Sequence, residues 1–274
     1  MKSRVSTKII LHVFLVLLTI IVLIPLVWML INSFKTNKEM MTDSLSLPAQ
    51  WQLSNYNNAW NKGLSGYFIN SIFITALSVC FICLLAAMAA FGLSRFKFKG
   101  QNVLFFIILG GMMVSEYCAV VPLFKMLNAI NLYNSQWGLI FIYTAFRLPF
   151  SIFLMRSYFM GLSKDIEEAA IIDGCGTMRI FWQITLPLSK PIVLSAAIIS
   201  AIFVWNEFLF AMLFLENRNL MTMPIGLQVF RGQLKIDYVS SMAGIVICSL
   251  PLILVFIIFQ KQFVRGLSAG GVKA

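Results

Sequence analysis

Long runs of apolar residues, separated by short polar segments, fill most of this chain. Six runs are long enough to cross a hydrocarbon layer about 30 Å thick, which takes roughly 20 residues of helix. They are residues 9–31, 67–93, 102–124, 136–155, 191–215 and 239–259. Their length and the absence of two-residue alternation favour helices over barrel strands. The pattern predicts an all-α membrane protein with six transmembrane helices, organised as a single domain over residues 1–274.

The composition excludes a water-soluble enzyme. Of all residues, 60% are hydrophobic and 11% are charged, whereas an average globular chain has about 25% charged residues. The net charge of +11 does not indicate a nucleic-acid partner, because the basic residues lie in short segments between the apolar runs. The lipid bilayer is the expected environment, and we predict that the chain lies in the cell membrane as a multi-pass protein.

The distribution of Lys and Arg sets the expected orientation. If the N-terminus is inside, the inner segments hold 13 basic residues and the outer segments, of similar total length, hold seven. Basic residues stay on the cytoplasmic side of a membrane, so both termini are predicted to be cytoplasmic. The first apolar run lacks a small-residue cleavage site after it, and we interpret it as a retained span rather than a signal peptide.

The inner connection over residues 156–190 is much longer than the others and has the pattern of a helix, a glycine turn and a second helix. Ser163 can cap the first helix, whose first turn carries three acidic residues that favour the positive end of the helix dipole. Gly174 is expected to turn the chain with a positive φ, at a place where a Cβ would clash. Thr177 can cap the second helix. From the residues alone, this segment is either a docking surface for a soluble partner or an amphipathic hairpin on the bilayer surface.

Several stretches resemble the carbohydrate branch of ABC-importer permeases, specifically the second permease of maltose-type systems. The segment from Glu168 to Pro187 resembles the EAA loop of that family, with Cys175 where Ala is common. The residues that match are Glu168, Ala169, Ala170, Asp173, Gly174, Ile184, Leu186 and Pro187. Further matching stretches are Asn55-Tyr56, Asn70-Ser71, Ala89-Ala90-Phe91, Ser94-Arg95, Leu148-Pro149-Phe150, Trp205-Asn206-Glu207-Phe208 and Phe263-Val264-Arg265-Gly266-Leu267.

The resemblance implies a type I importer permease fold and a set of partners. These are a second permease subunit, two cytoplasmic ATPase subunits and an extracytoplasmic sugar-binding protein. The EAA loop would dock on an ATPase, with Glu168 pairing with a basic group there and Gly174 making the sharp turn. The sequence contains no G-x-x-x-x-G-K-[ST] loop, so we expect this chain to bind no cofactor and ATP and Mg²⁺ to be bound by the partner ATPase. It is predicted not to be an enzyme.

Three charged residues interrupt the apolar runs. Glu207 would either hydrogen-bond a neighbouring helix, with Asn206, or line a substrate pathway together with Trp205 and Asn206. Glu116 and Arg147 would form a structural ion pair that lowers the cost of placing either charge in lipid. The alternative for Arg147 is recognition of an anionic group on the substrate.

Other features have plainer readings. The cluster of Arg95, Lys97 and Lys99 is expected to be a topology anchor, and the glycine-rich tail from Gly266 is not expected to form a stable helix unaided. No metal site is expected. A secondary transporter is disfavoured because we find neither inverted repeats nor signs of broken helices, and the Trp205–Phe208 stretch disfavours a permease for amino acids or anions.

Overall fold

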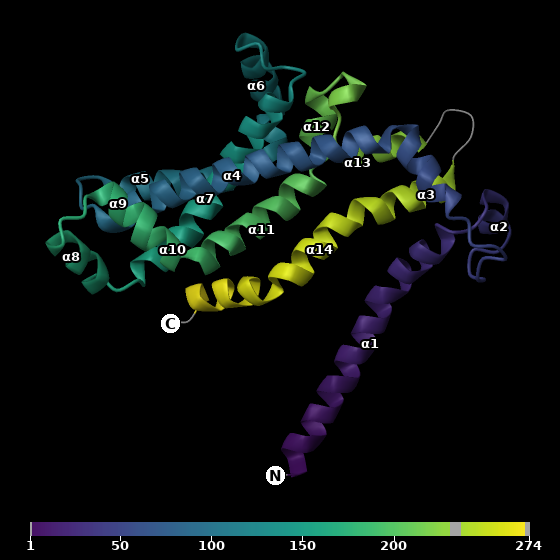
Figure 1. The fold of residues 1–274 in the computed structure, drawn as a ribbon, viewed down its shortest axis with the longest axis horizontal. Helices are drawn as coiled ribbons and strands as arrows, with labels where there is room; N and C mark the ends of the chain where they lie inside the picture. Colours follow the sequence, from purple (N-terminus) through teal and green to yellow (C-terminus); the bar gives the residue numbers. More distant parts are fainter. Residues whose placement is uncertain (1, 231–236, 272–274) are drawn as a thin grey trace. The chain divides into compact units, whose positions relative to one another are not determined.

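The computed structural model describes residues 2–230 and 237–271, and the side chains of residues 8–228 and 237–260. The α-helices are α1 (Lys2–Asn32), α2 (Asn37–Thr42), α3 (Ser54–Ala59), α4 (Ser65–Arg95), α5 (Gln101–Gly110), α6 (Glu116–Ala129), α7 (Gln136–Met160), α8 (Asp165–Ile172), α9 (Thr177–Ile180), α10 (Leu186–Leu188), α11 (Lys190–Asn206), α12 (Leu209–Phe214), α13 (Met223–Gly226) and α14 (Tyr238–Gly271). Short 3-10 or π turns connect some of them: η1 (Trp60–Leu64), η2 (Gly111–Met113), η3 (Phe181–Thr185), η4 (Arg218–Leu220) and η5 (Leu227–Phe230). No strand occurs in the described part of the chain, which confirms the predicted all-α class (Figure 1).

Four described stretches are long and apolar enough to cross a membrane as they stand. They are Lys8–Asn32, Ser54–Arg95, Gln136–Met160 and Tyr238–Gln260. Two further pairs of helices pass the same test only if each bent pair is counted as one span, which gives up to six. The described part of the chain therefore has between four and six candidate spans by length and composition.

The third predicted span is not one straight helix. The segment ending at Met113 and α6 meet at an angle of 100°. Val114 and Ser115 between them are extended, with ψ of 120° and 129°. Gly110 and Gly111 precede the break, and glycine weakens a helix interior. The expectation of an unbroken helix over 102–124 is wrong.

The fifth predicted span is also interrupted. α11 ends at Asn206, Glu207 is extended with ψ of 130°, and α12 starts at Leu209. The expectation that the chain has no broken helices is therefore wrong as well. The physical reason is local: the Glu207 carboxylate accepts the backbone N–H groups of Phe210 and Ala211 at 2.8 and 3.2 Å, so that a new helix start is stabilised directly after the break.

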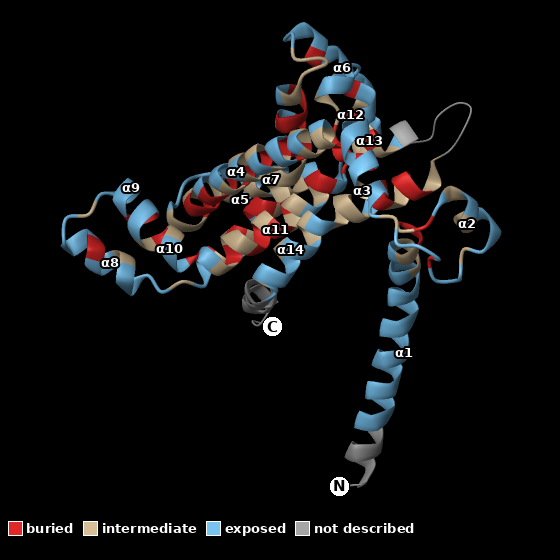
Figure 2. Cartoon of the chain, turned by 45° about the vertical axis from the view of Figure 1, so that its right-hand side comes forward, coloured by how far each residue is buried: buried red, intermediate tan, exposed pale blue. Residues whose placement is uncertain are grey.

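The chain divides into two compact units, one of residues 66–225 with 251–274 and the other of residues 1–65 with 226–250. In the first unit, two groups of buried side chains form the core. One surrounds Ala86, Ala87 and Ala90 of α4, whose small side chains allow close helix approach. The other surrounds Tyr143 of α7 and Phe210 of α12. Figure 2 shows buried positions along α4, α7 and α11.

The second unit contains α1, α2, α3 and the first part of α14. Residues 8–27 of its apolar first span are exposed, and 0% of the most apolar stretch is buried (Figure 2). Beyond α1, the buried ammonium of Lys35 donates to the carbonyl of Asp43 at 2.8 Å, and the amide of Asn55 donates to the carbonyls of Ser33 and Lys35. Polar side chains therefore fix the turn that follows the span.

The start of α14 is fixed in the same unit by Asp237. Its carboxylate accepts from the Lys62 ammonium at 2.5 Å and from the Asn37 amide at 3.0 Å. At its other end α14 continues to Gly271, so the tail up to that residue is helical as an extension of α14. Extending an existing helix adds one hydrogen bond per residue without a new nucleus, and the prediction that the tail forms no stable helix unaided stays a prediction. The tail side chains, including the Phe263–Leu267 stretch, and residues 272–274 lie outside the described residues.

Candidate functional site

Residues 163–188 form a compact projection at one end of the larger unit, which we call the knuckle (Figure 1). The first helix of the knuckle, α8, starts at Asp165. Its cap residue is Lys164 and not Ser163 as predicted, although the Ser163 hydroxyl accepts the backbone N–H of Asp165 at 3.2 Å. Asp165, Glu167 and Glu168 lie in its first turn, where the helix dipole favours negative charge. Thr177 is the first residue of α9 rather than its cap, because Gly176 takes the cap position.

Gly174 makes the turn between the two helical parts of the knuckle. Its φ is +78°, and the N–H groups of Gly174 and Cys175 donate to the carbonyls of Ile171 and Ala170 at 3.0 and 2.9 Å. This is the hydrogen-bond pattern of a Schellman motif, which favours glycine at this position. No atom lies within 4 Å of the position that a Cβ would take. The expected clash is therefore absent within this chain, and the cost of a side chain here comes from the backbone conformation alone.

The knuckle has a buried and an exposed face. Ala170, Ile180 and Phe181 are buried and pack with Phe91 at the end of α4. The outer face carries an apolar patch of Ile171, Ile172 and Met178, of which Ile172 is 86% exposed. Of the residues that match the EAA loop, Glu168, Ala169, Asp173, Gly174 and Pro187 are exposed, and Ile184 and Leu186 are half-buried. The exposed acidic side chain and the apolar patch are thus available to another surface.

A buried ion pair joins the knuckle to α4, and sequence reasoning missed it. The Nε of Arg95 donates to Oε1 of Glu167 at 2.9 Å and lies 2.8 Å from Oε2, and the Thr185 hydroxyl donates to the same carboxylate at 3.2 Å. The side chains of Arg95 and Glu167 are 8% and 13% exposed. Arg95 was expected to be a topology anchor, and Glu167 lies next to the residue that the motif emphasises. The 72 residues between the two partners hide the pair from any local pattern.

Glu207 is buried, with 8% exposure, and its hydrogen bonds are all internal. Besides the two backbone N–H groups of α12, its carboxylate accepts the hydroxyl of Tyr143 of α7 at 2.6 Å. Asn206 is exposed and donates to the carbonyl of Ile202 at 2.7 Å rather than to Glu207. Glu207 thus joins α7 to the break between α11 and α12.

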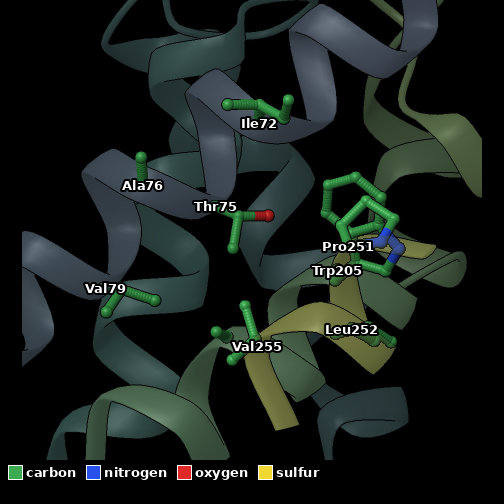
Figure 3. Close-up of a pocket in the computed structure, with 9 residues that line it drawn as sticks. Ile72, Thr75, Ala76, Val79, Trp205, Pro251, Leu252 and Val255 are labelled. Atoms are coloured by element: carbon green, nitrogen blue, oxygen red, sulfur yellow. The ribbon is translucent and has the colours of Figure 1, made fainter. Parts of the chain in front are cut away.

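The environment of Trp205 differs from that of its neighbours Asn206 and Glu207. It is buried and meets Phe68 edge-on, with ring centroids 5.8 Å apart. It lines a pocket of about 280 Å³ between α4, α11 and the second part of α14. The residues around this space are Ile72, Thr75, Ala76, Val79, Ala201, Trp205, Pro251, Leu252 and Val255 (Figure 3). Apart from Thr75 and the indole ring, the lining is aliphatic.

Glu116 and Arg147 form an ion pair with 2.5 Å between Oε1 and Nη2. The Arg147 guanidinium also lies over the ring of Phe203, which provides a cation–π contact. The side chains of Arg147 and Glu116 are 25% and 33% exposed in the chain taken alone. Glu116 is the first residue of α6, so the break in the third predicted span places the carboxylate at a helix start facing α7.

No group of three or more His, Cys, Asp or Glu side chains is arranged to hold a metal ion within the described ranges.

The model of one protein family, described as the binding-protein-dependent transport system inner membrane component, matches residues 82–269. This chain belongs to that family. The permease lies in the cell membrane as a multi-pass protein, as predicted, and the match covers the knuckle, the helix break at Glu207 and most of the larger unit.

Similar proteins show which transport systems this permease resembles. It is 44% identical over 261 residues to a probable ABC transporter permease protein, YurM, of Bacillus subtilis, covering 95% of this chain and 87% of that protein. It is 36% identical to the diacetylchitobiose uptake system permease protein NgcG of Streptomyces coelicolor, covering 94% and 87%. The crystal structure of a bacterial ABC transporter involved in the import of the acidic polysaccharide alginate has a chain that superposes with a TM-score of 0.85 and 25% identity, covering 96% of this chain and 98% of that chain.

These findings confirm the resemblance to the carbohydrate branch of ABC-importer permeases. The relatives are transport subunits and not enzymes, which confirms that this permease is a non-catalytic subunit and that the ATPase activity of the complex lies in partner subunits.

Proposed function

We propose that this permease forms half of the translocation pathway of an ATP-driven importer for a sugar or an oligosaccharide. Six spans with both termini in the cytoplasm fit the four long apolar helices, the bent pair over residues 101–129 counted as one span, and α11 together with α12. They also fit the excess of basic residues in the segments assigned to the inside. A second permease subunit supplies the other half of the pathway. An external binding protein delivers the substrate, in keeping with the family description.

The substrate class follows from the relatives and from one aromatic side chain. NgcG is named for diacetylchitobiose uptake, and the superposed transporter for alginate import. Trp205, beside the hydroxyl of Thr75, gives the pocket of Figure 3 a flat ring face of the kind on which sugar rings stack. We place Trp205 and the exposed Asn206 on the pathway wall. Glu207 supports that wall from behind, because its carboxylate is already used by Tyr143 and α12.

Coupling to ATP hydrolysis is assigned to the knuckle. The observation that carries this assignment is the exposed face formed by Ile171 and Ile172 before the Schellman turn and Met178 after it. The exposed Glu168 remains available to pair with a partner. An exposed apolar patch rimmed by charge is typical of a protein–protein interface. A partner ATPase would receive this face, and its basic group would pair with Glu168.

The mechanism is alternating access. ATP and Mg²⁺ bind to the two partner ATPases, and their closure moves the knuckle. Because the buried face of the knuckle packs on the end of α4, the movement reaches the spans and opens the pathway outward to receive sugar from the binding protein. The pathway returns inward after hydrolysis.

The test uses the assembled complex, purified through the permease, with two substitutions on the knuckle. Glu168→Lys should release the ATPase or uncouple it, at a cost on the order of 2–5 kcal/mol if the charge pair at the interface is desolvated. Gly174→Asp should have the same effect through the strained φ of +78°. Gly176→Ala is the matched control, since Gly176 has a φ of −74° and open space for a Cβ. The measurements are retained ATPase and sugar uptake, with diacetylchitobiose and alginate oligosaccharides as the first probes.

If both Glu168→Lys and Gly174→Asp retain the ATPase and the parental rate of uptake, the knuckle is not the coupling element. The amphipathic hairpin on the bilayer surface then becomes the better interpretation of residues 163–188.

A further inference from the structure

The geometry points to Arg95 as a positioning residue that makes the knuckle and the end of α4 move as one body. We call Arg95, Glu167 and Thr185 the Arg95 clamp. This inference rests on the proposed coupling function of the knuckle and adds to it the route by which movement of the knuckle enters the membrane. Arg95 acts through Glu167 and does not itself contact a substrate.

The clamp joins three elements at one point. Glu167 belongs to α8 and Thr185 to η3, so the single carboxylate that Arg95 holds is bonded to both helical parts of the knuckle. Arg95 is the last residue of α4. A displacement of either part of the knuckle is thereby passed to the same residue at the end of α4.

The end of α4 is tied equally firmly to the spans. The carbonyl of Leu93 accepts from the amide of Gln101 of α5 at 2.6 Å and from Nε of Arg156 of α7 at 3.1 Å. The Arg156 guanidinium also lies 4.0 Å from the ring centroid of Phe105 of α5. Three charged or polar side chains therefore connect the knuckle, α4, α5 and α7 within three residues of α4.

Stability alone is a poor explanation for the clamp. Nη1 and Nη2 of Arg95 are buried and have no hydrogen-bond partner among the described residues, and unsatisfied buried donors cost free energy. Buried ion pairs are also often no more stable than well-packed apolar replacements. A buried ion pair that leaves donors without partners is expected where the position of the side chains matters more than the free energy of folding.

The knuckle does not need the clamp in order to fold. Ala170, Ile180 and Phe181 pack with Phe91 of α4, and the rings of Phe91 and Phe181 lie 5.2 Å apart. Removing the guanidinium leaves this apolar contact in place. Loss of the clamp should therefore loosen the position of the knuckle without detaching it.

The experiment measures a distance inside the assembled complex, with its ATPases and second permease. Spin labels replace Ile166 on α8 and Met88 on α4, both exposed and both outside the apolar patch, in a background whose five cysteines are replaced. Double electron–electron resonance is recorded without nucleotide and after trapping with ATP and vanadate. The parental chain should give one narrow distance that is the same in both states. Arg95→Ala should give a broadened distribution or one that changes with nucleotide.

Two variants separate positioning from folding and from topology. Lys97→Ala removes a basic charge from the same inner segment, and since Lys97 is exposed it should leave the distance unchanged. Arg95→Glu combined with Glu167→Arg should restore the narrow distance. In addition, Arg95→Ala should keep the ATPase bound while its stimulation by the binding protein falls by about fivefold or more.

The proposed role of the Arg95 clamp is overturned if the distance distribution of Arg95→Ala stays narrow and independent of nucleotide. It is also overturned if Lys97→Ala broadens the distribution equally. These outcomes differ from failure of the proposed function. That failure is read from Glu168→Lys and Gly174→Asp, which leave the clamp intact.

Discussion

Two carboxylates are buried in the larger unit, and they are buried in opposite ways. Glu207 uses both oxygens, on the Tyr143 hydroxyl and on two backbone N–H groups of α12. Glu167 also accepts from two elements, but its partner Arg95 keeps two buried nitrogens without a partner among the described residues. One site satisfies its hydrogen bonds and the other does not.

The difference separates a structural role from a mechanical one. A fully satisfied buried carboxylate at a helix start lowers the free energy of the fold. A buried ion pair with unsatisfied donors adds little stability and instead fixes a position. We therefore expect substitutions at Glu207 to act on folding and substitutions at Arg95 to act on coupling.

The largest expected effect follows Glu207→Ala. Removal of the carboxylate leaves the Tyr143 hydroxyl and two backbone N–H groups without an acceptor, which should destabilise the permease by about 3–5 kcal/mol. Thermal unfolding of the purified permease in detergent, followed by circular dichroism, measures the loss. Asn206→Ala is the control, because Asn206 is exposed, and it should shift the free energy of unfolding by less than about 0.5 kcal/mol. If Glu207→Ala instead lost sugar uptake with an unchanged melting temperature, Glu207 would be assigned to the pathway. The contrast between a structural Glu207 and a mechanical Arg95 would then be wrong.

A smaller effect is expected for Glu116 and Arg147, whose ion pair is more exposed than either of these sites, with side chains 33% and 25% exposed. Neutralising either residue should lower the yield of folded complex more than neutralising both, because a single change leaves one charge without its partner in an apolar region. The expected coupling free energy in the cycle of Glu116→Gln and Arg147→Gln is about 1–2 kcal/mol. The yield of folded complex after detergent extraction and the melting temperature both measure this coupling. Additive losses would show that the two charges do not depend on each other.

The smallest effect is expected for Asp237 in the other unit, whose partner Lys62 is half-exposed. Burial raises the pKa of Asp237, but hydrogen bonds from Lys62, Asn37 and Ser240 outweigh it and lower the pKa from 3.8 to about 2. A folded pKa below the unfolded value means that the stabilisation is complete above about pH 4 and is lost as the pH falls through 2. Its size should be below about 1 kcal/mol.

Melting of the parental chain and of Asp237→Asn across this pH range tests the last prediction. The two chains should differ at neutral pH and converge as the pH falls toward 2. A difference that is constant with pH would mean that the ionised form of Asp237 is not the one that stabilises the fold.

Local patterns in the sequence were sufficient for much of this description. The apolar runs predicted the helical membrane class, and the acidic turn followed by Gly174 predicted the helix, the turn and its positive φ. The exceptions within the knuckle were the two caps, because Lys164 rather than Ser163 caps α8 and Gly176 rather than Thr177 caps α9. These features depend on residues a few positions apart, so the propensities and hydrogen bonds that determine them can be read along the chain.

The breaks in the third and fifth predicted spans could not be read in that way. The segments on both sides of Val114 and of Glu207 are apolar, so the pattern of hydrophobic residues does not mark a break. A break in an apolar run is stable only where other groups satisfy the freed backbone. At Glu207 those groups are its own carboxylate and the helix that it caps. The long-range pairs were equally hidden, except for Glu116 and Arg147, which were paired because a charge in an apolar run requires a partner.

The sequence by itself therefore determined the class of protein, the positions of the apolar helices and the exposed turn of the knuckle, because each is a local consequence of hydrophobicity and backbone preference. Only the tertiary structure decided that Arg95 holds Glu167, that Glu207 is turned inward to Tyr143, and that Trp205 rather than its neighbours lines the pocket. The physical reason is that the energy of a buried polar group depends on which partner reaches it, and that partner lies on another helix, dozens of residues away.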